Sequence, residues 1–129
     1  MLRLYKKQKL CSPTAIGMLF GRQPDTSSAL AHPLRAVWRQ NPGRKSDAPA
    51  QFLISVPKKR LRHAVDRVTM RRRIREAYRL LHQEYPLPDA ARIDVAFVYV
   101  ANVLEPYARV EKAMRRILTA IQQHANAQQ

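Results

Sequence analysis

Ten basic side chains lie in the stretch from Lys58 to Arg79, and the chemistry open to them is phosphate binding. The same stretch has only two acids, Asp66 and Glu76. Such a density of positive charge repels itself unless a polyanion binds to it. Arginine suits this role because its planar fork binds phosphate through two hydrogen bonds and keeps its charge. The candidate phosphate-binding residues are Lys58, Lys59, Arg60, Arg62, Arg67, Arg71, Arg72, Arg73, Arg75 and Arg79.

The second half of this stretch has the period of an amphipathic helix, which we predict from about Asp66 to Glu84. At about 100° per residue, one narrow arc collects apolar side chains, with Tyr78 at its edge. These apolar residues are Met70, Ile74, Ala77 and Leu81. A contiguous second face carries Arg71, Arg72, Arg75 and Arg79. One side can therefore pack on a core while the other presents guanidinium groups. An ordinary solvated face is disfavoured, because ordinary surfaces intersperse both signs of charge.

No catalytic or metal-ligating constellation is recognisable, so we predict no catalytic residue and no metal site in the protein itself. The four histidines have no ligand partner at metal-binding spacing, and three glycines do not form a phosphate loop. We interpret Asp66 as a partner of the helix dipole and Glu76 as an ion-pair partner of Arg72 or Arg79. Cys11 is the only cysteine and has no neighbouring histidine.

Composition narrows the class of partner. The chain has 129 residues, 46% of them hydrophobic, and a net charge of +15. These values predict one globular domain over residues 1–129 and favour nucleic acid over an anionic membrane as its partner. No apolar run reaches the length of a spanning helix, and the cluster at 15–20 is too short for a signal sequence. A lone cysteine fits a reducing cytoplasm.

The elements that must position the basic helix follow from period and turn residues. We expect a basic arm at 1–11 and a short helix from Ser12-Pro13 to Gly21, with Ile16 and Phe20 on one face. Residues 22–32 and 41–50 are predicted loops. Strands are predicted at Leu34–Arg39 and Gln51–Val56, and these two are expected to pair antiparallel. In the first, Leu34, Ala36 and Trp38 share one side.

The last third of the chain supplies a buried strand and a helix. Residues 93–100 are almost continuously apolar, which is typical of a strand buried on both faces. Pro106 suits a first helical position, and the stripe that follows it predicts a helix. A flexible tail is expected at 124–129. The order is helix, strands, basic helix, strand, helix. We predict an α+β sandwich with the helices mainly on one face of a small sheet and the other face open for a ligand.

A family resemblance extends this reading. The sequence resembles the protein component of bacterial ribonuclease P in three successive runs. These are Ser55-Val56-Pro57-Lys58-Lys59, Ala64-Val65-Asp66-Arg67 and the run from Met70 to Arg79. The first helix and the last strand and helix are also similar to that family. One departure is clear. The family's Arg-Asn-Arg signature falls on Arg67-Val68-Thr69, so only its first arginine is present.

The resemblance implies a mixed sheet with a left-handed parallel crossover, similar to the second domain of a small-subunit ribosomal protein. It implies a cytoplasmic ribonucleoprotein endonuclease that removes the 5′ leader from precursor transfer RNA. The catalytic RNA subunit would act with Mg²⁺, and the protein would be its non-catalytic subunit, with no membrane role and no obligatory protein partner. The basic helix would bind that RNA, and a cleft would bind the leader. Candidates for the cleft are Ile16, Phe20 and Trp38.

Two alternatives remain open on the sequence. Ile16 and Phe20 fit an ordinary apolar core as well as a single-strand platform. A structural ribosomal-RNA-binding protein without a role in cleavage has the same composition, and only the Ser55 to Arg79 block favours ribonuclease P. A stand-alone nuclease or DNA-binding protein is disfavoured, because metal ligands and a helix-turn-helix are both lacking.

Overall fold

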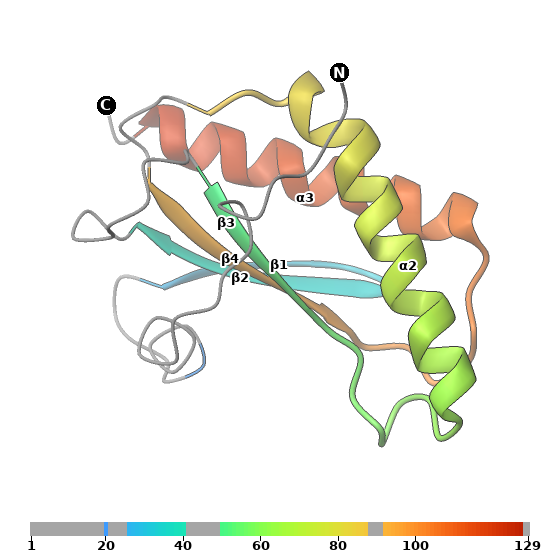
Figure 1. Ribbon diagram of the computed structural model, residues 1–129. Helices are drawn as coiled ribbons and strands as arrows, with labels where there is room; N and C mark the ends of the chain where they lie inside the picture. Colours follow the sequence, from blue (N-terminus) through green and yellow to red (C-terminus); the bar gives the residue numbers. More distant parts are fainter. Residues whose placement is uncertain (1–19, 21–25, 41–49, 88–91, 128–129) are drawn as a thin grey trace.

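The computed structural model describes Phe20 and residues 26–40, 50–87 and 92–127. Two helices cover one face of a four-stranded sheet (Figure 1), and the predicted order of elements is confirmed within these residues. The elements are β1 (Ser27–Ala31), β2 (Leu34–Gln40), β3 (Ala50–Ser55), α2 (Ala64–Leu81), a 3-10 turn (His82–Glu84), β4 (Ile93–Tyr99) and α3 (Tyr107–Ala127). The expected basic arm and Ile16 lie outside the described residues.

The sheet order is β1-β2-β4-β3, which corrects the expected antiparallel pairing of β2 with β3. Strand β4 lies between them, antiparallel to β2 and parallel to β3. Apart from Asp94, its side chains are mainly apolar on both faces, so the central position buries more of them than an edge would. Chain connectivity from β3 through α2 to β4 makes a left-handed crossover, as the resemblance implied (Figure 1).

Strand β1 overturns the predicted loop over 22–32 for its residues Ser27–Ala31. It pairs antiparallel with β2, with Ser27 opposite Trp38 and Ala31 opposite Leu34. The polar and small residues of this segment resemble a loop in composition. An edge strand buries only one face, however, and Ala29 and Ala31 are sufficient to cover that face. The segment shows no alternation of polar and apolar residues, because Leu30 is exposed between Ala29 and Ala31, so its pairing with β2 decides that it is a strand.

The core lies between the sheet and the helices, and the predicted helical stripes are confirmed. On α2, the buried residues are Met70, Ile74, Ala77, Tyr78 and Leu81. On α3 they include Val110, Met114, Ile117, Leu118 and Ile121. The Tyr78 ring packs 4.6 Å from Phe52 and 5.4 Å from Phe97, measured between centroids. Burial raises the pKa of the Tyr78 hydroxyl. These three aromatic rings fix α2 on the edge of the sheet that β3 forms.

Helix α3 runs to Ala127, so the predicted flexible tail is wrong for residues 124–127. Ala125 is buried, and His124 contacts Trp38 and Ser27 through its ring nitrogens. Tertiary contacts therefore order a segment whose polar composition suggests fraying. No described helix is both long and apolar enough to cross a membrane.

Candidate nucleic-acid interface

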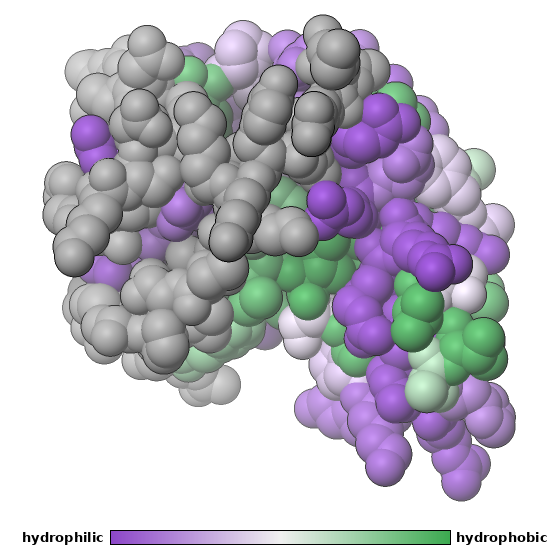
Figure 2. All heavy atoms as spheres, viewed as in Figure 1, coloured by the Kyte–Doolittle hydropathy of each residue, from purple (hydrophilic) through white to green (hydrophobic). Residues whose placement is uncertain are grey.

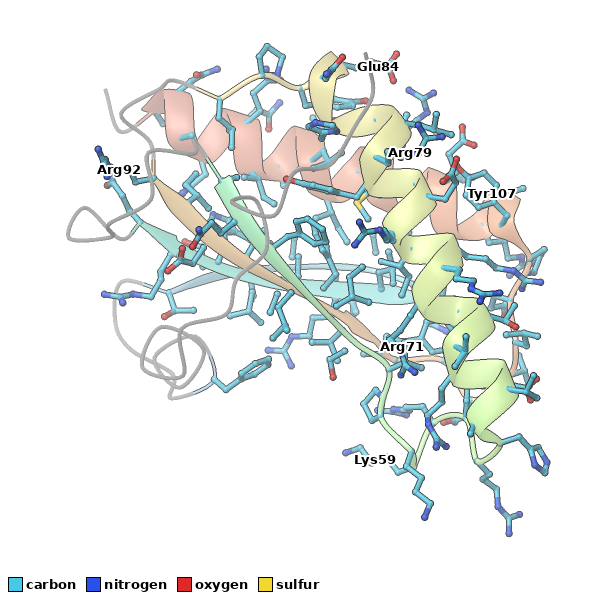
Figure 3. The ribbon with its side chains drawn as sticks, in the orientation of Figure 1. Lys59, Arg71, Arg79, Glu84, Arg92 and Tyr107 are labelled. Carbon is cyan, nitrogen blue, oxygen red and sulfur yellow. The ribbon has the colours of Figure 1, made fainter. Side chains whose placement is uncertain are left out.

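The basic face begins in the turn that precedes α2 and continues along the helix. Lys58, Lys59 and Arg62 are exposed in the turn, and Arg71 and Arg72 are exposed on the helix. Figure 3 shows Lys59, Arg71 and Arg79 in this order along the molecule. Within the described part of the chain, the side chains of Lys58, Lys59, Arg62, Arg71 and Arg72 have no hydrogen-bond or ion-pair partner. The same holds for Arg75, which is half-buried.

Two of the predicted phosphate ligands have structural contacts instead. An Nη of Arg67 donates to the backbone carbonyl oxygens of Leu61 and Arg62, at 3.0 and 2.9 Å, and so holds the turn against the first turn of the helix. An Nη of Arg73 donates to the carbonyl oxygen of Glu105 at 2.6 Å, joining α2 to the loop before α3. Both side chains are partly buried. They shape the surface that the other arginines present.

Arg79 and Arg60 have polar partners nearer the surface. The Arg79 guanidinium binds both carboxylate oxygens of Glu76, at 2.5 and 3.1 Å, which confirms one of the two pairings expected for Glu76. The hydrogen bond from Arg79 lowers the pKa of the Glu76 carboxyl. Arg60 donates to Oδ1 of Asn102 at 3.2 Å. The exposed cations without such partners are therefore concentrated in the turn and in the middle of α2.

The departure from the family signature has a visible consequence. Figure 2 shows hydrophilic side chains gathered over α2 and its preceding turn, with an apolar patch among them. Val65 is 70% exposed and Val68 39% exposed, on the face that also carries the arginines. Thr69 donates its hydroxyl to the carbonyl oxygen of Val65 at 2.9 Å, within the helix. Val68 thus offers apolar contact where the family signature has an amide, and Thr69 offers a hydroxyl bonded within the helix where the signature has a guanidinium group.

A cleft of about 570 Å³ lies beside the turn, on the sheet face opposite the helices. Phe20 is 48% exposed at this cleft, and Arg35, Lys59 and Arg60 supply positive charge. Its remaining lining residues are Thr26, Ser28, Val37, Pro57, Val98, Tyr99 and Val100. An aromatic ring, an apolar floor and flanking cations are the features that hold single-stranded nucleic acid.

The three residues predicted for a leader cleft have separate outcomes. Phe20 lines the cleft. Ile16 lies outside the described residues. Trp38 does not line the cleft, because its side chain is 3% exposed and packs on the helix side of the sheet. The period of β2 places Trp38 with Leu34 and Ala36, and all three face the core.

The residues that the sequence reasoning missed lie on the other side of the same strands. Val37 from β2, Ser28 from β1 and Val98 from β4 form part of the cleft wall. Residue Arg35, opposite Val98 in the ladder, is exposed beside them. Their signal was the alternation of β2, which assigns Arg35 and Val37 to the face that the helices leave open.

Metal-binding chemistry has no visible basis in the part of the chain that the structure describes. No three His, Cys, Asp or Glu side chains come together there as ligands for a metal ion.

Comparison with known proteins gives a consistent result. A family model described as Ribonuclease P matches residues 4–122. Ribonuclease P protein components from two strains of Porphyromonas gingivalis are 33% identical over 123 residues, which cover 92% of this chain and 85% of each relative. A mutant RNase P protein of Staphylococcus aureus, described as defective in mRNA degradation, has a TM-score of 0.69 at 16% identity, covering 91% of this chain and 90% of its own. The RNase P protein of Thermotoga maritima has a TM-score of 0.54 at 17% identity, with 89% and 88% covered.

Proposed function

Since this chain belongs to the family of bacterial ribonuclease P protein components, we propose that its basic face binds the catalytic RNA subunit and its cleft binds the 5′ leader of precursor transfer RNA. The protein is a subunit of ribonuclease P, a ribonucleoprotein that processes transfer RNA. The family match decides against the alternative of a structural ribosomal-RNA-binding protein. The assignment of particular residues to the two RNAs is our proposal.

Contact with the RNA subunit is supported by the cations without protein partners. Lys58, Lys59 and Arg62 in the turn, with Arg71 and Arg72 on α2, form a row of exposed cations that Val65 and Val68 interrupt. Such a row binds backbone phosphates and responds to the shape of an RNA, because it has no arrangement of donors and acceptors that would distinguish bases. Arg67 and Arg73 contribute by holding the turn and the α3 loop in place.

Contact with the leader is supported by the composition of the cleft. A base stacked on Phe20 would leave its phosphates within reach of Arg35 and Lys59, whichever base it is. The observation that carries the proposal is that the cleft and the turn before α2 have Lys59 and Arg60 in common. Both line the cleft, and both belong to the turn that begins the basic face. A leader in the cleft and an RNA subunit on α2 would therefore meet at this turn.

We propose that the protein positions RNA and that the catalytic RNA subunit, with its Mg²⁺ ions, performs the hydrolysis. The protein then adds contacts with the leader to the contacts that the RNA subunit makes with the substrate. We expect this assembly in the cytoplasm and without an obligatory second protein.

Phe20→Ala tests the assignment of the cleft. One stacked base contributes about 1–3 kcal/mol, so the affinity of the holoenzyme for precursor should fall by about five- to 150-fold. Affinity for mature transfer RNA, which has no leader, should not change. Leu30→Ala is the matched control, because Leu30 is 72% exposed on the same sheet face but does not line the cleft. Equal losses for precursor and mature product, or no loss for either, would refute the leader cleft.

A further inference from the structure

A second cationic hollow lies at the opposite edge of the sheet from the basic face. It has a volume of about 370 Å³ and is formed by the N-terminal half of α3 and the turn between β1 and β2. The lining residues are Ala31, His32, Arg109, Lys112, Ala113 and Arg116. No acidic side chain of the described residues belongs to this lining. A hollow with three permanent cations and no acid has the charge pattern of an anion site.

The cations of this hollow come from one side of α3. Arg109, Lys112 and Arg116 recur at intervals of three and four residues, so they share one stripe of the helix. Arg115, next in sequence to Arg116, points to a different side. It forms ion pairs with Glu84 at 3.4 Å and with Glu111 at 3.5 Å. Glu84 and Glu111 therefore pair with Arg115 and not with Lys112 or Arg116 of the stripe.

The charges of the stripe are largely uncommitted. Among the described residues, Lys112 and Arg116 have no hydrogen-bond or ion-pair partner, and both are exposed. Arg109 is paired with Glu105 at 3.5 Å through Nε, which leaves its two Nη nitrogens for another acceptor. The turn that carries His32 is anchored, because the N–H of Val100 donates to the carbonyl oxygen of Pro33 at 2.9 Å. The walls of the hollow are thus held by the fold.

The position of the hollow separates it from the basic face. It adjoins β1, whereas α2 packs against β3, and these strands are the two edges of the sheet. Three strand spacings of 4.7–4.9 Å separate these strands, so the two edges of the sheet lie about 14 Å apart. A phosphate bound there cannot be one that Arg71 or Arg72 binds at the same time.

We infer that this hollow is a second phosphate-binding site, which binds the sugar–phosphate backbone of an RNA in the ribonuclease P assembly. RNA is favoured over an acidic protein because arginine forks fit phosphate and the protein is already a subunit of a ribonucleoprotein. The inference rests on the proposed function in one respect only, which is that the protein is bound to RNA. The protein would then be held at both edges of its sheet, and its orientation relative to the RNA would be fixed.

The test compares Arg116→Gln with Arg115→Gln, two adjacent and exposed residues with the same loss of charge. Affinity for the RNA subunit is measured over a series of salt concentrations, and affinity of each holoenzyme for precursor is measured in the same way. Each phosphate contact adds about 0.9 to the slope of log affinity against log salt on a duplex. We expect Arg116→Gln to lower the slope by about one in one of the two assays, and Lys112→Gln/Arg116→Gln by about two. Arg115→Gln should change neither slope.

The two assays identify the source of the phosphate: a loss during assembly assigns it to the RNA subunit, and a loss only with precursor assigns it to the substrate. Equal effects of the two arginine variants would mean that only overall charge matters and would overturn the site. Unchanged RNA binding by the double variant would also overturn it, and weaker binding of polyglutamate by that variant would then assign the hollow to an acidic protein. The Phe20→Ala result is independent of all these outcomes, so the two proposals can fail separately.

Discussion

Trp38 and His124 are joined by a hydrogen bond of 3.2 Å from the indole Nε1–H to Nδ1 of the imidazole. An indole nitrogen can only donate, so Nδ1 accepts and the proton of the neutral ring lies on Nε2. That nitrogen lies 3.2 Å from Oγ of Ser27, to which it donates. The last turns of α3 are thus linked to both β1 and β2. The contact explains why Trp38 belongs to the core and why α3 extends past His124.

Trp38→Phe should therefore affect folding and leave substrate choice unchanged. The substitution removes a donor, leaves Nδ1 of His124 without its partner, and creates a small cavity. We expect the free energy of unfolding to fall by about 1–3 kcal/mol, measured by urea denaturation. The ratio of precursor to mature affinity should stay at the wild-type value in the folded holoenzyme. A selective loss of precursor affinity would return Trp38 to the leader site.

Arg71→Gln/Arg75→Gln should weaken assembly with the RNA subunit without unfolding the protein. Neither guanidinium group has a hydrogen-bond or ion-pair partner among the described residues, so their loss removes phosphate contacts and few internal ones. The slope of log affinity against log salt should fall by up to about two. Asn126→Glu/Ala127→Glu is the control, because it changes net charge equally at exposed positions at the end of α3. A gel-shift titration and circular dichroism separate binding from folding, and equal slopes for both variants would contradict the proposal.

Arg73 and Arg72 are neighbours that should respond in opposite ways to the same substitution. Arg73→Gln breaks the hydrogen bond to the carbonyl oxygen of Glu105, and we expect the free energy of unfolding to fall by about 1–3 kcal/mol. Arg72→Gln lies on the exposed surface and should change it by less than about 0.5 kcal/mol. RNA affinity should show the reverse order at a temperature where both variants are folded. Equal stabilities would mean that the Arg73 contact contributes nothing.

The Glu76 carboxyl should titrate below the ordinary range for glutamate, because the Arg79 guanidinium stabilises its charged form. A lowered folded-state pKa contributes stability above the unfolded-state pKa, and this contribution is lost as pH falls through the folded-state value. The pair is largely exposed, so solvent screening makes the contribution small. Side-chain carboxyl chemical shifts over a pH series measure the pKa directly. In Arg79→Gln the pKa should return toward the ordinary value, and an unchanged pKa would contradict this cause.

The sequence by itself determined the elements whose burial pattern is complete within one segment. The stripe from Met70 to Leu81 predicted both the core face of α2 and the arginine face opposite it, because a helix of regular period fixes which side chains share a side. The apolar run at 93–99 predicted a strand buried on both faces, and the run after Pro106 predicted α3. The concentration of positive charge predicted a surface that binds nucleic acid, and the resemblance to a known family specified RNA.

Only the tertiary structure decided the features that depend on contacts between distant segments. The central position of β4 between β2 and β3 depends on which of the strands buries the most apolar surface. The sequence of one segment does not determine this, because it depends on the other strands as well. Ser27–Ala31 is a strand because its backbone pairs with β2. His124 remains in the helix because Trp38 and Ser27 form hydrogen bonds with its ring. The same contacts divided the basic residues, since Arg67 and Arg73 reach backbone carbonyls while Arg71 and Arg72 face solvent. A local period fixes the direction of a side chain, but its partner is chosen by what the fold brings within reach.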